Sequence, residues 1–233
     1  MTELAESLKR HPCAVLGVPA WASLAELEQK RRDAALFGDE RMAEKALEAL
    51  THPASRLTAE LRWFPGMDLQ ETEKWVQFAV SGEEGKKAPD YVGDTFLAHF
   101  QTVRICLDKL EAEESLDWEM IMKSMLLASQ FLLPRQVMEE INRDRLRAGM
   151  DVIQSEKDVA EGLDELFREA VDQLAKKMTG FMTGREFGAY ALRMSKEYKY
   201  RSGQFFHCRM VRIAAERLEL MRSKSLGGRA YNL

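Results

Sequence analysis

Residues 23–50 read SLAELEQKRRDAALFGDERMAEKALEAL, and this stretch decides the fold class. Ser23 is a favourable N-cap, and Glu26 stands three positions later, so the two form the capping box that starts a helix. A second apolar stripe follows at the spacing of one helix face: Met42, Ala46, Leu47 and Leu50. We therefore expect one helix over 24–37 and a second over 40–50, separated by Gly38 and Asp39.

The helical pattern continues over nearly the whole chain. Ala, Leu, Glu, Lys, Arg and Met are abundant, whereas alternating Val, Ile and Thr runs are almost absent. Pro53 and Pro65 end helices, and Asp68 or Thr72 can start one. Further helices are expected over 95–112, 115–133, 135–148, 155–178, 185–198 and 203–224, with Ser155 as the cap of the long one. The predicted fold class is all-α.

Residues 81–94, SGEEGKKAPDYVGD, are the clearest linker in the sequence. They contain three Gly, one Pro and a run of charged residues. We therefore expect a helical module over 1–80, a linker over 81–94 and a helical bundle domain over 95–233.

The composition is that of a globular protein. The chain has 233 residues, 45% apolar and 31% charged, which excludes wholesale disorder, and only 14 Gly and 6 Pro, which excludes collagen-like sequence. No apolar run is long enough to span a bilayer. MTELAESLKRHP at the start lacks the apolar core of a secretory signal. The three Cys residues are odd in number and far apart in the sequence, which favours reduced thiols. These features predict a cytoplasmic chain that binds no membrane.

Residues 11–65 carry a pattern of specific positions. HPCAVLGVPAWASLAEL begins with an apolar-Leu-Gly-Val signature and leads to a helix start at Ser23. ALEALTHPASRL ends with an apolar pair, a Thr, a turn containing Pro53 and the basic Arg56. This pattern resembles the J domain of the Hsp40 (DnaJ-type) co-chaperones. The resemblance implies a J-like helical module followed by the C-terminal bundle.

The resemblance fails between its two long helices. The family has a His-Pro-Asp tripeptide there, which triggers ATP hydrolysis by Hsp70, whereas this chain reads LFGDER over 36–41. The family's second helix presents a basic face to Hsp70, and the residues that match it here are Lys30, Arg31 and Arg32. We therefore expect a degenerate J-like module that keeps the fold and this partner-binding face but does not stimulate the ATPase.

The sequence contains no pattern typical of a catalytic, cofactor or metal site. Cys13, Cys106 and Cys208 form no CxxC pair, and the His residues form no HxxxH or HExxH motif. Cys residues are expected to be buried and inert, and His99 to lie on the core face of its helix. The carboxylates of Glu139 and Glu140 are expected to lie on a solvated face. The prediction is therefore a protein that is not an enzyme.

The C-terminal part of the chain is basic. Residues 185–233 contain eleven Lys or Arg and four Glu, a net charge of +7, whereas the whole chain has −4. Aromatic residues alternate there with cations that could bind a partner: Lys196, Lys199, Arg201, Arg209 and Arg212. The expected surface would bind an acidic protein segment, or single-stranded nucleic acid through stacking and phosphate contacts.

The function predicted from these features is that of a non-catalytic, chaperone-associated adaptor. Its partner is expected to be a protein, either an Hsp70 or a larger complex. Two alternatives stay open: an Hsp70 co-chaperone that uses the variant loop, and a nucleic-acid-associated protein that uses the basic C-terminal helices.

Overall fold

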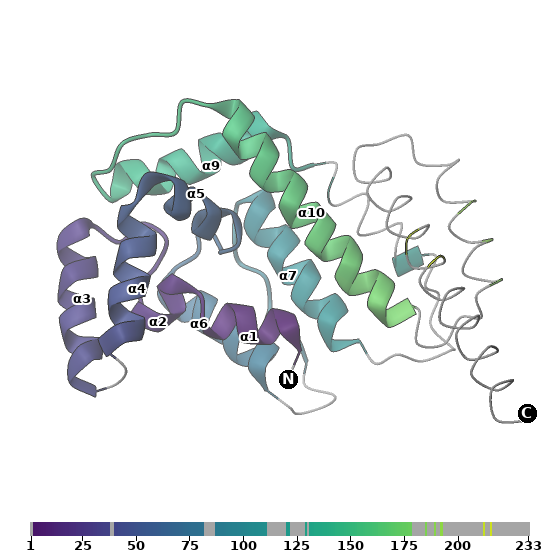
Figure 1. The fold of residues 1–233 in the computed structure, drawn as a ribbon, viewed down its shortest axis with the longest axis horizontal. Coiled ribbons are helices and arrows are strands. Elements are labelled where there is room, and N and C mark those ends of the chain that lie inside the picture. Colours follow the sequence, from purple (N-terminus) through teal and green to yellow (C-terminus); the bar gives the residue numbers. More distant parts are fainter. Residues whose placement is uncertain are drawn as a thin grey trace, which may run out of the picture. The chain divides into compact units, whose positions relative to one another are not determined.

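The computed structural model describes residues 2–37, 40–81, 87–110 and 131–178, and eight single residues between 120 and 215. Within these residues it contains nine helices and no strand (Figure 1), which confirms the all-α class. The helices are α1 (Glu3–Lys9), α2 (Pro12–Leu16), α3 (Leu24–Phe37), α4 (Glu40–Thr51), α5 (Pro53–Leu61), α6 (Leu69–Val80), α7 (Phe96–Lys109), α9 (Pro134–Arg147) and α10 (Glu156–Met178).

The chain forms two compact units. Unit 1 consists of Met1–Leu110 and Phe131–Leu166, and unit 2 of Glu111–Gln130 and Phe167–Leu233. Helices α1 to α7, helix α9 and the first part of α10 therefore belong to unit 1. The helices expected over 115–133, 185–198 and 203–224 lie almost entirely outside the described residues.

Short-range signals start several helices where the sequence predicts them. The hydroxyl of Ser23 accepts from the Glu26 N–H at 3.3 Å, and the Glu26 carboxylate accepts in return from the Ser23 N–H at 2.8 Å. The capping box is therefore confirmed. Asp68 caps α6, and Ser155 accepts from the Asp158 N–H at the start of α10.

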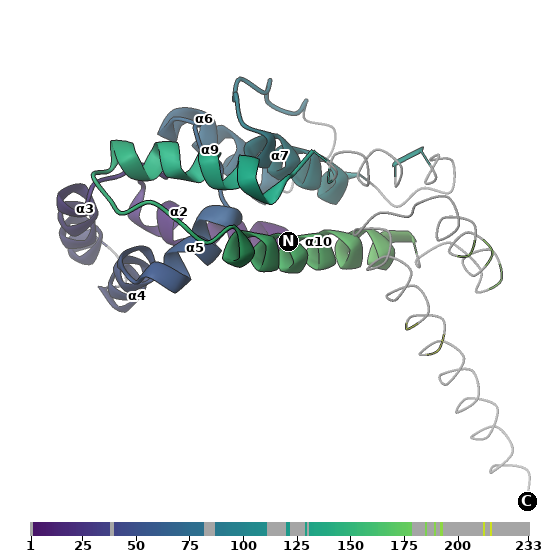
Figure 2. The same cartoon turned by 90° about the horizontal axis from the view of Figure 1, so that it is seen from above.

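The core of unit 1 lies between α2, α4, α6 and α7. Leu16, Leu50, Trp75 and Ile105 are four of its buried members, one from each helix. Helix α4 packs against both α2 and α3, and α7 packs against α1, α6 and α9. Figure 2 shows α3 and α4 side by side, as does Figure 1, so consecutive helices form a hairpin at one end of unit 1.

The predicted linker connects α6 to α7 within the same unit. Ala88 and Tyr91 from this segment pack against the core cluster, and the Tyr91 hydroxyl donates to the Thr95 carbonyl at 2.6 Å. Unit 1 therefore includes helices from both sides of residues 81–94. Residues 82–86 lie outside the described residues.

A turn at Gly66 joins α5 and α6 to two distant segments. Gly66 has φ +77°, and a Cβ built there would lie 2.9 Å from Asp94 Oδ1 and 3.0 Å from Thr95 Cγ2. The Gly66 N–H donates to Asp144 of α9, and the Thr95 hydroxyl donates to the Pro65 carbonyl. Both the backbone conformation and the close approach require glycine here.

None of the helices that the structure describes has the length and apolar character needed to cross a bilayer.

Candidate functional site

The candidate partner-binding surface is the outer face of α3 in the α3–α4 hairpin. Leu27, 1% exposed, fixes the inner face of α3 because it belongs to the core cluster. Lys30 and Arg32 are exposed, whereas Arg31 is half-buried. Successive residues point about 100° apart around a helix, so Lys30 and Arg32 lie roughly 160° apart, and Arg32 is the one that points away from Leu27. Within the predicted basic cluster, Arg32 therefore lies on the outer face of α3 and Lys30 on its flank.

Hydrogen bonds along α3 order one of these cations. Arg32 donates to the side chain of Gln29 at 2.8 Å, and Gln29 donates to Asp33 at 2.8 Å. Lys30 has no ion-pair partner among the described residues. A cation that is free of carboxylates is available to an acidic partner, so Lys30 adds an unpaired charge on the flank of this face.

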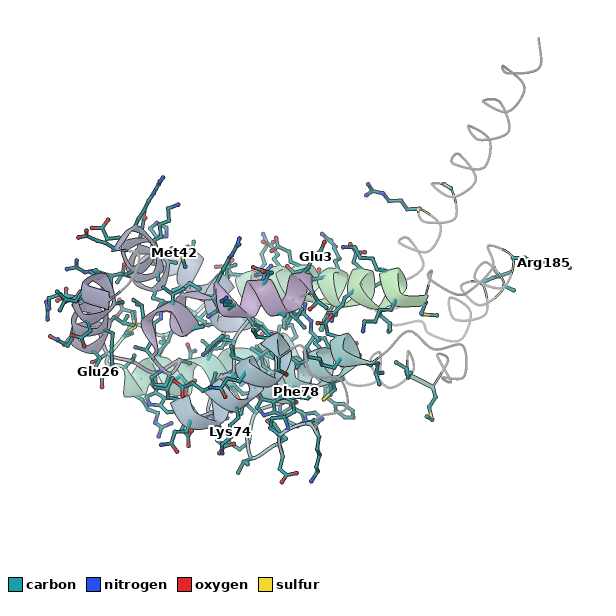
Figure 3. All side chains as sticks on the ribbon, turned by 90° about the horizontal axis from the view of Figure 1, so that it is seen from below. Glu3, Glu26, Met42, Lys74, Phe78 and Arg185 are labelled. Carbon is teal, nitrogen blue, oxygen red and sulfur yellow. The ribbon has the colours of Figure 1, made fainter. Side chains whose placement is uncertain are left out.

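The hairpin also exposes apolar side chains next to the turn that joins its two helices. Leu36 near the end of α3 is 78% exposed, and Met42 in the first turn of α4 is 42% exposed. Figure 3 shows Glu26 and Met42 projecting from these two neighbouring helices. Gly38 and Asp39, which connect the two helices, lie outside the described residues. Exposed apolar residues next to cations are suited to protein recognition.

The base of the hairpin is held by the buried side chain of Arg56. This guanidinium, in a residue 3% exposed, donates to the Leu50 carbonyl at 2.8 Å and to the Ala20 carbonyl at 3.2 Å. Its Nε also donates to Glu60 at 2.8 Å. Arg56 therefore ties α5 to the last turn of α4 and to the loop that precedes α3. The sequence marked Arg56 only through the resemblance, and the Pro53-x-x-Arg56 spacing gave no sign of its burial.

His11 and Cys13 are buried and serve the local structure. Burial lowers the pKa of His11 to about 4, against the opposing effect of its hydrogen bond to the Ala59 carbonyl. The ring accepts from the Cys13 N–H, which caps α2, and it stacks on Trp63 at 4.1 Å between centroids. Burial raises the pKa of the Cys13 thiol to about 12. The thiolate is therefore not populated near neutral pH.

Two expectations about single residues are wrong. Glu140 is buried and accepts from the N–H groups of Phe96 and Leu97, and its burial raises its pKa; only Glu139 is exposed. His99 is exposed instead of buried, with its ring 5.0 Å from that of Tyr91. The buried face of α7 is set by Leu97, Ala98, Phe100 and Gln101, which leaves His99 on the other side.

The second predicted surface lies largely outside the described residues. Of its five cations only Arg212 is described, and it is exposed on a helix; Lys196, Lys199, Arg201 and Arg209 are not. The described part of the chain contains no group of three or more His, Cys, Asp or Glu that could hold a metal ion.

Comparisons with known proteins gave no match: no family model, no curated protein and no solved structure is similar to this chain.

Proposed function

We propose that this chain is a non-catalytic adaptor whose degenerate J-like module binds a protein partner through the outer face of α3. The observation that carries the proposal is the exposure of Arg32 on the side of α3 away from the core residue Leu27, with the exposed Lys30 on the flank of the same helix. A short α2, the α3–α4 hairpin and α5 after His52-Pro53 also follow the order of helices that the resemblance implies.

The favoured partner is an Hsp70, bound without stimulation of its ATPase. Engagement of an acidic surface requires the exposed cations of α3, whereas the trigger requires a His-Pro-Asp tripeptide that the sequence lacks. The co-chaperone alternative needs the variant loop at 36–41 to replace that tripeptide. The nucleic-acid alternative needs cations that lie, except for Arg212, outside the described residues.

The test is binding of the purified full chain to a purified Hsp70, together with the Hsp70 ATPase rate. Lys30→Glu with Arg32→Glu is expected to weaken binding at least tenfold. The matched control is Arg135→Glu with Lys157→Glu, which reverses two exposed cations on α9 and α10. Equal binding by both double variants would contradict the proposed surface. A raised ATPase rate with the wild-type chain would instead favour the co-chaperone alternative.

A further inference from the structure

The hairpin base depends on one buried guanidinium that in turn depends on one carboxylate. Arg56 makes two of its three hydrogen bonds to neutral carbonyls, those of Leu50 and Ala20. Within the described residues, Glu60 is the only carboxylate that pairs with Arg56. A buried cation is stable only when its charge is compensated. Glu60 therefore keeps Arg56 in the position from which it holds the hairpin.

Glu60 is itself held by α9. Arg145, 7% exposed, donates from Nη2 to Glu60 Oε2 at 2.7 Å, and its Nε lies 3.0 and 3.1 Å from the two carboxylate oxygens. Within the described residues, Oε2 of Glu60 accepts from Arg145 alone, whereas Oε1 is shared between Arg145 and Arg56. A fork of this kind fixes the orientation of the carboxylate as well as its charge.

Helix α9 is attached to unit 1 mainly through polar groups. Three of its five buried residues are charged, namely Glu140, Asp144 and Arg145, and the other two are Val137 and Ile141. Glu140 accepts from the first N–H groups of α7, and Asp144 accepts from the Gly66 N–H. The position of α9 is thus set by directional contacts, each of which ends on a different segment.

We infer that α9 is a strap on the α3–α4 hairpin, and that it acts through the relay Arg145–Glu60–Arg56. When the Arg145 fork is lost, Oε2 of Glu60 is buried without a donor, and the carboxylate turns toward water. Arg56 then loses its charge partner, and the carbonyls of Leu50 and Ala20 lose their donor. The hairpin base opens while α7 remains packed in the core. This inference is independent of the proposed partner, because it concerns only contacts within unit 1.

The test is native-state hydrogen exchange on the full chain, with Arg145→Met as the variant. We expect exchange of the amides in the last turn of α4 to rise at least tenfold, and that of α7 amides to rise much less. Arg135→Met on the same helix is the control, since Arg135 is exposed and pairs only with Glu139 among the described residues. It is expected to leave the hairpin unchanged.

A second variant separates the relay from general damage to α9. Glu60→Gln keeps Arg145 and the other polar contacts of α9 but removes the charge that compensates the buried Arg56, so exchange in the last turn of α4 is expected to rise here as well. The inference is overturned if Arg145→Met affects α9 alone, or raises exchange equally in α4 and α7. If Arg145→Met does not fold, Arg145→Lys decides: a selective rise in α4 supports the strap, and its absence overturns it.

Discussion

Arg145 and Glu60 are 85 positions apart in the sequence, yet their side chains form a buried fork with a closest N–O distance of 2.7 Å. Neither residue lies in the segment that predicts the fold. Their contact ties α9 to α5 and, through Arg56, to the hairpin that carries the candidate binding surface. The hairpin is therefore held in part by a helix that lies far from it in the sequence.

The fork predicts that two arginines of α9 contribute very differently to the free energy of unfolding. Arg145→Met leaves a buried carboxylate short of donors and is expected to lower the free energy of unfolding by about 3–5 kcal/mol. Arg143→Met removes an exposed pair with Asp94, whose N–O distance is 3.5 Å, and should cost less than about 1 kcal/mol. Urea unfolding of both variants measures the two losses in the free energy of unfolding. Equal losses would show that the buried fork stabilises the fold no more than the exposed pair does.

Asp144 predicts that one contribution to stability grows as the pH falls. Burial raises its pKa from 3.8 to about 6, although its hydrogen bond from Gly66 opposes the shift. The folded chain therefore takes up this proton at a higher pH than the unfolded chain does. The resulting stabilisation is fully present below pH 3.8 and is lost as the pH rises through 6; it amounts to at most about 3 kcal/mol.

Asp144→Asn tests this sign directly. The amide oxygen can still accept from the Gly66 N–H but carries no charge that must be buried. We expect the variant to be more stable than wild type at pH 7.5 and to lose the advantage by pH 4, as followed by urea unfolding at several pH values. A variant that is less stable than wild type at pH 7.5 would show that the charge of Asp144 is itself stabilising.

His11 predicts the opposite dependence on pH. Its folded-state pKa is lowered from 6.5 to about 4, chiefly by burial, so the unfolded chain binds this proton first. The contribution of neutral His11 is present above pH 6.5 and is lost as the pH falls through 4, by at most about 3 kcal/mol. Between pH 6 and 4 the contributions of His11 and Asp144 therefore offset each other.

The variant His11→Asn separates the pH-dependent contribution of His11 from that of Asp144. Asn keeps an acceptor that can cap α2 but loses the stacking on Trp63, so the variant should be less stable at pH 7.5. Because Asn does not titrate, the stability gap to wild type should narrow by about 2 kcal/mol between pH 7 and pH 5. Thermal unfolding at the two pH values measures the gap, and a constant gap would contradict a buried neutral imidazole.

Local chemistry explains which elements could be predicted from the sequence. The starts of α3, α6 and α10 depend on Ser23, Asp68 and Ser155, whose partners lie within three positions, so the sequence pattern contains both members of each contact. The start of α7 is different. Thr95 caps it locally, but Glu140 caps it as well from 44 positions away.

In the candidate site, too, contacts between residues that are distant in the sequence could not be predicted. Lys30, Arg31 and Arg32 were predicted together as one basic face, and the structure leaves Lys30 and Arg32 exposed and Arg31 half-buried. Arg56, Glu60 and Arg145 could not be recognised as one cluster, because charged residues are usually exposed and only the tertiary fold buries them together. Glu140 was misplaced for this reason: its neighbour Glu139 is exposed, whereas its own position faces the start of α7.

A comparison of two glycines in unit 1 distinguishes the stability cost of backbone strain from that of close packing. Gly66 and Gly149 both have positive φ, +77° and +68°, but a Cβ at Gly149 would meet nothing within 4 Å, whereas one at Gly66 would press on Asp94 and Thr95. Gly149→Ala is expected to cost about 1–2 kcal/mol for the left-handed conformation alone. Gly66→Ala carries the same cost and also forces apart the contacts of Pro65 with Thr95 and of Gly66 with Asp144, so its loss should exceed that of Gly149→Ala by at least about 1 kcal/mol. Urea unfolding of the two variants measures both losses. Equal losses would mean that the segment at Asp94 moves aside freely and that the turn does not depend on this close approach.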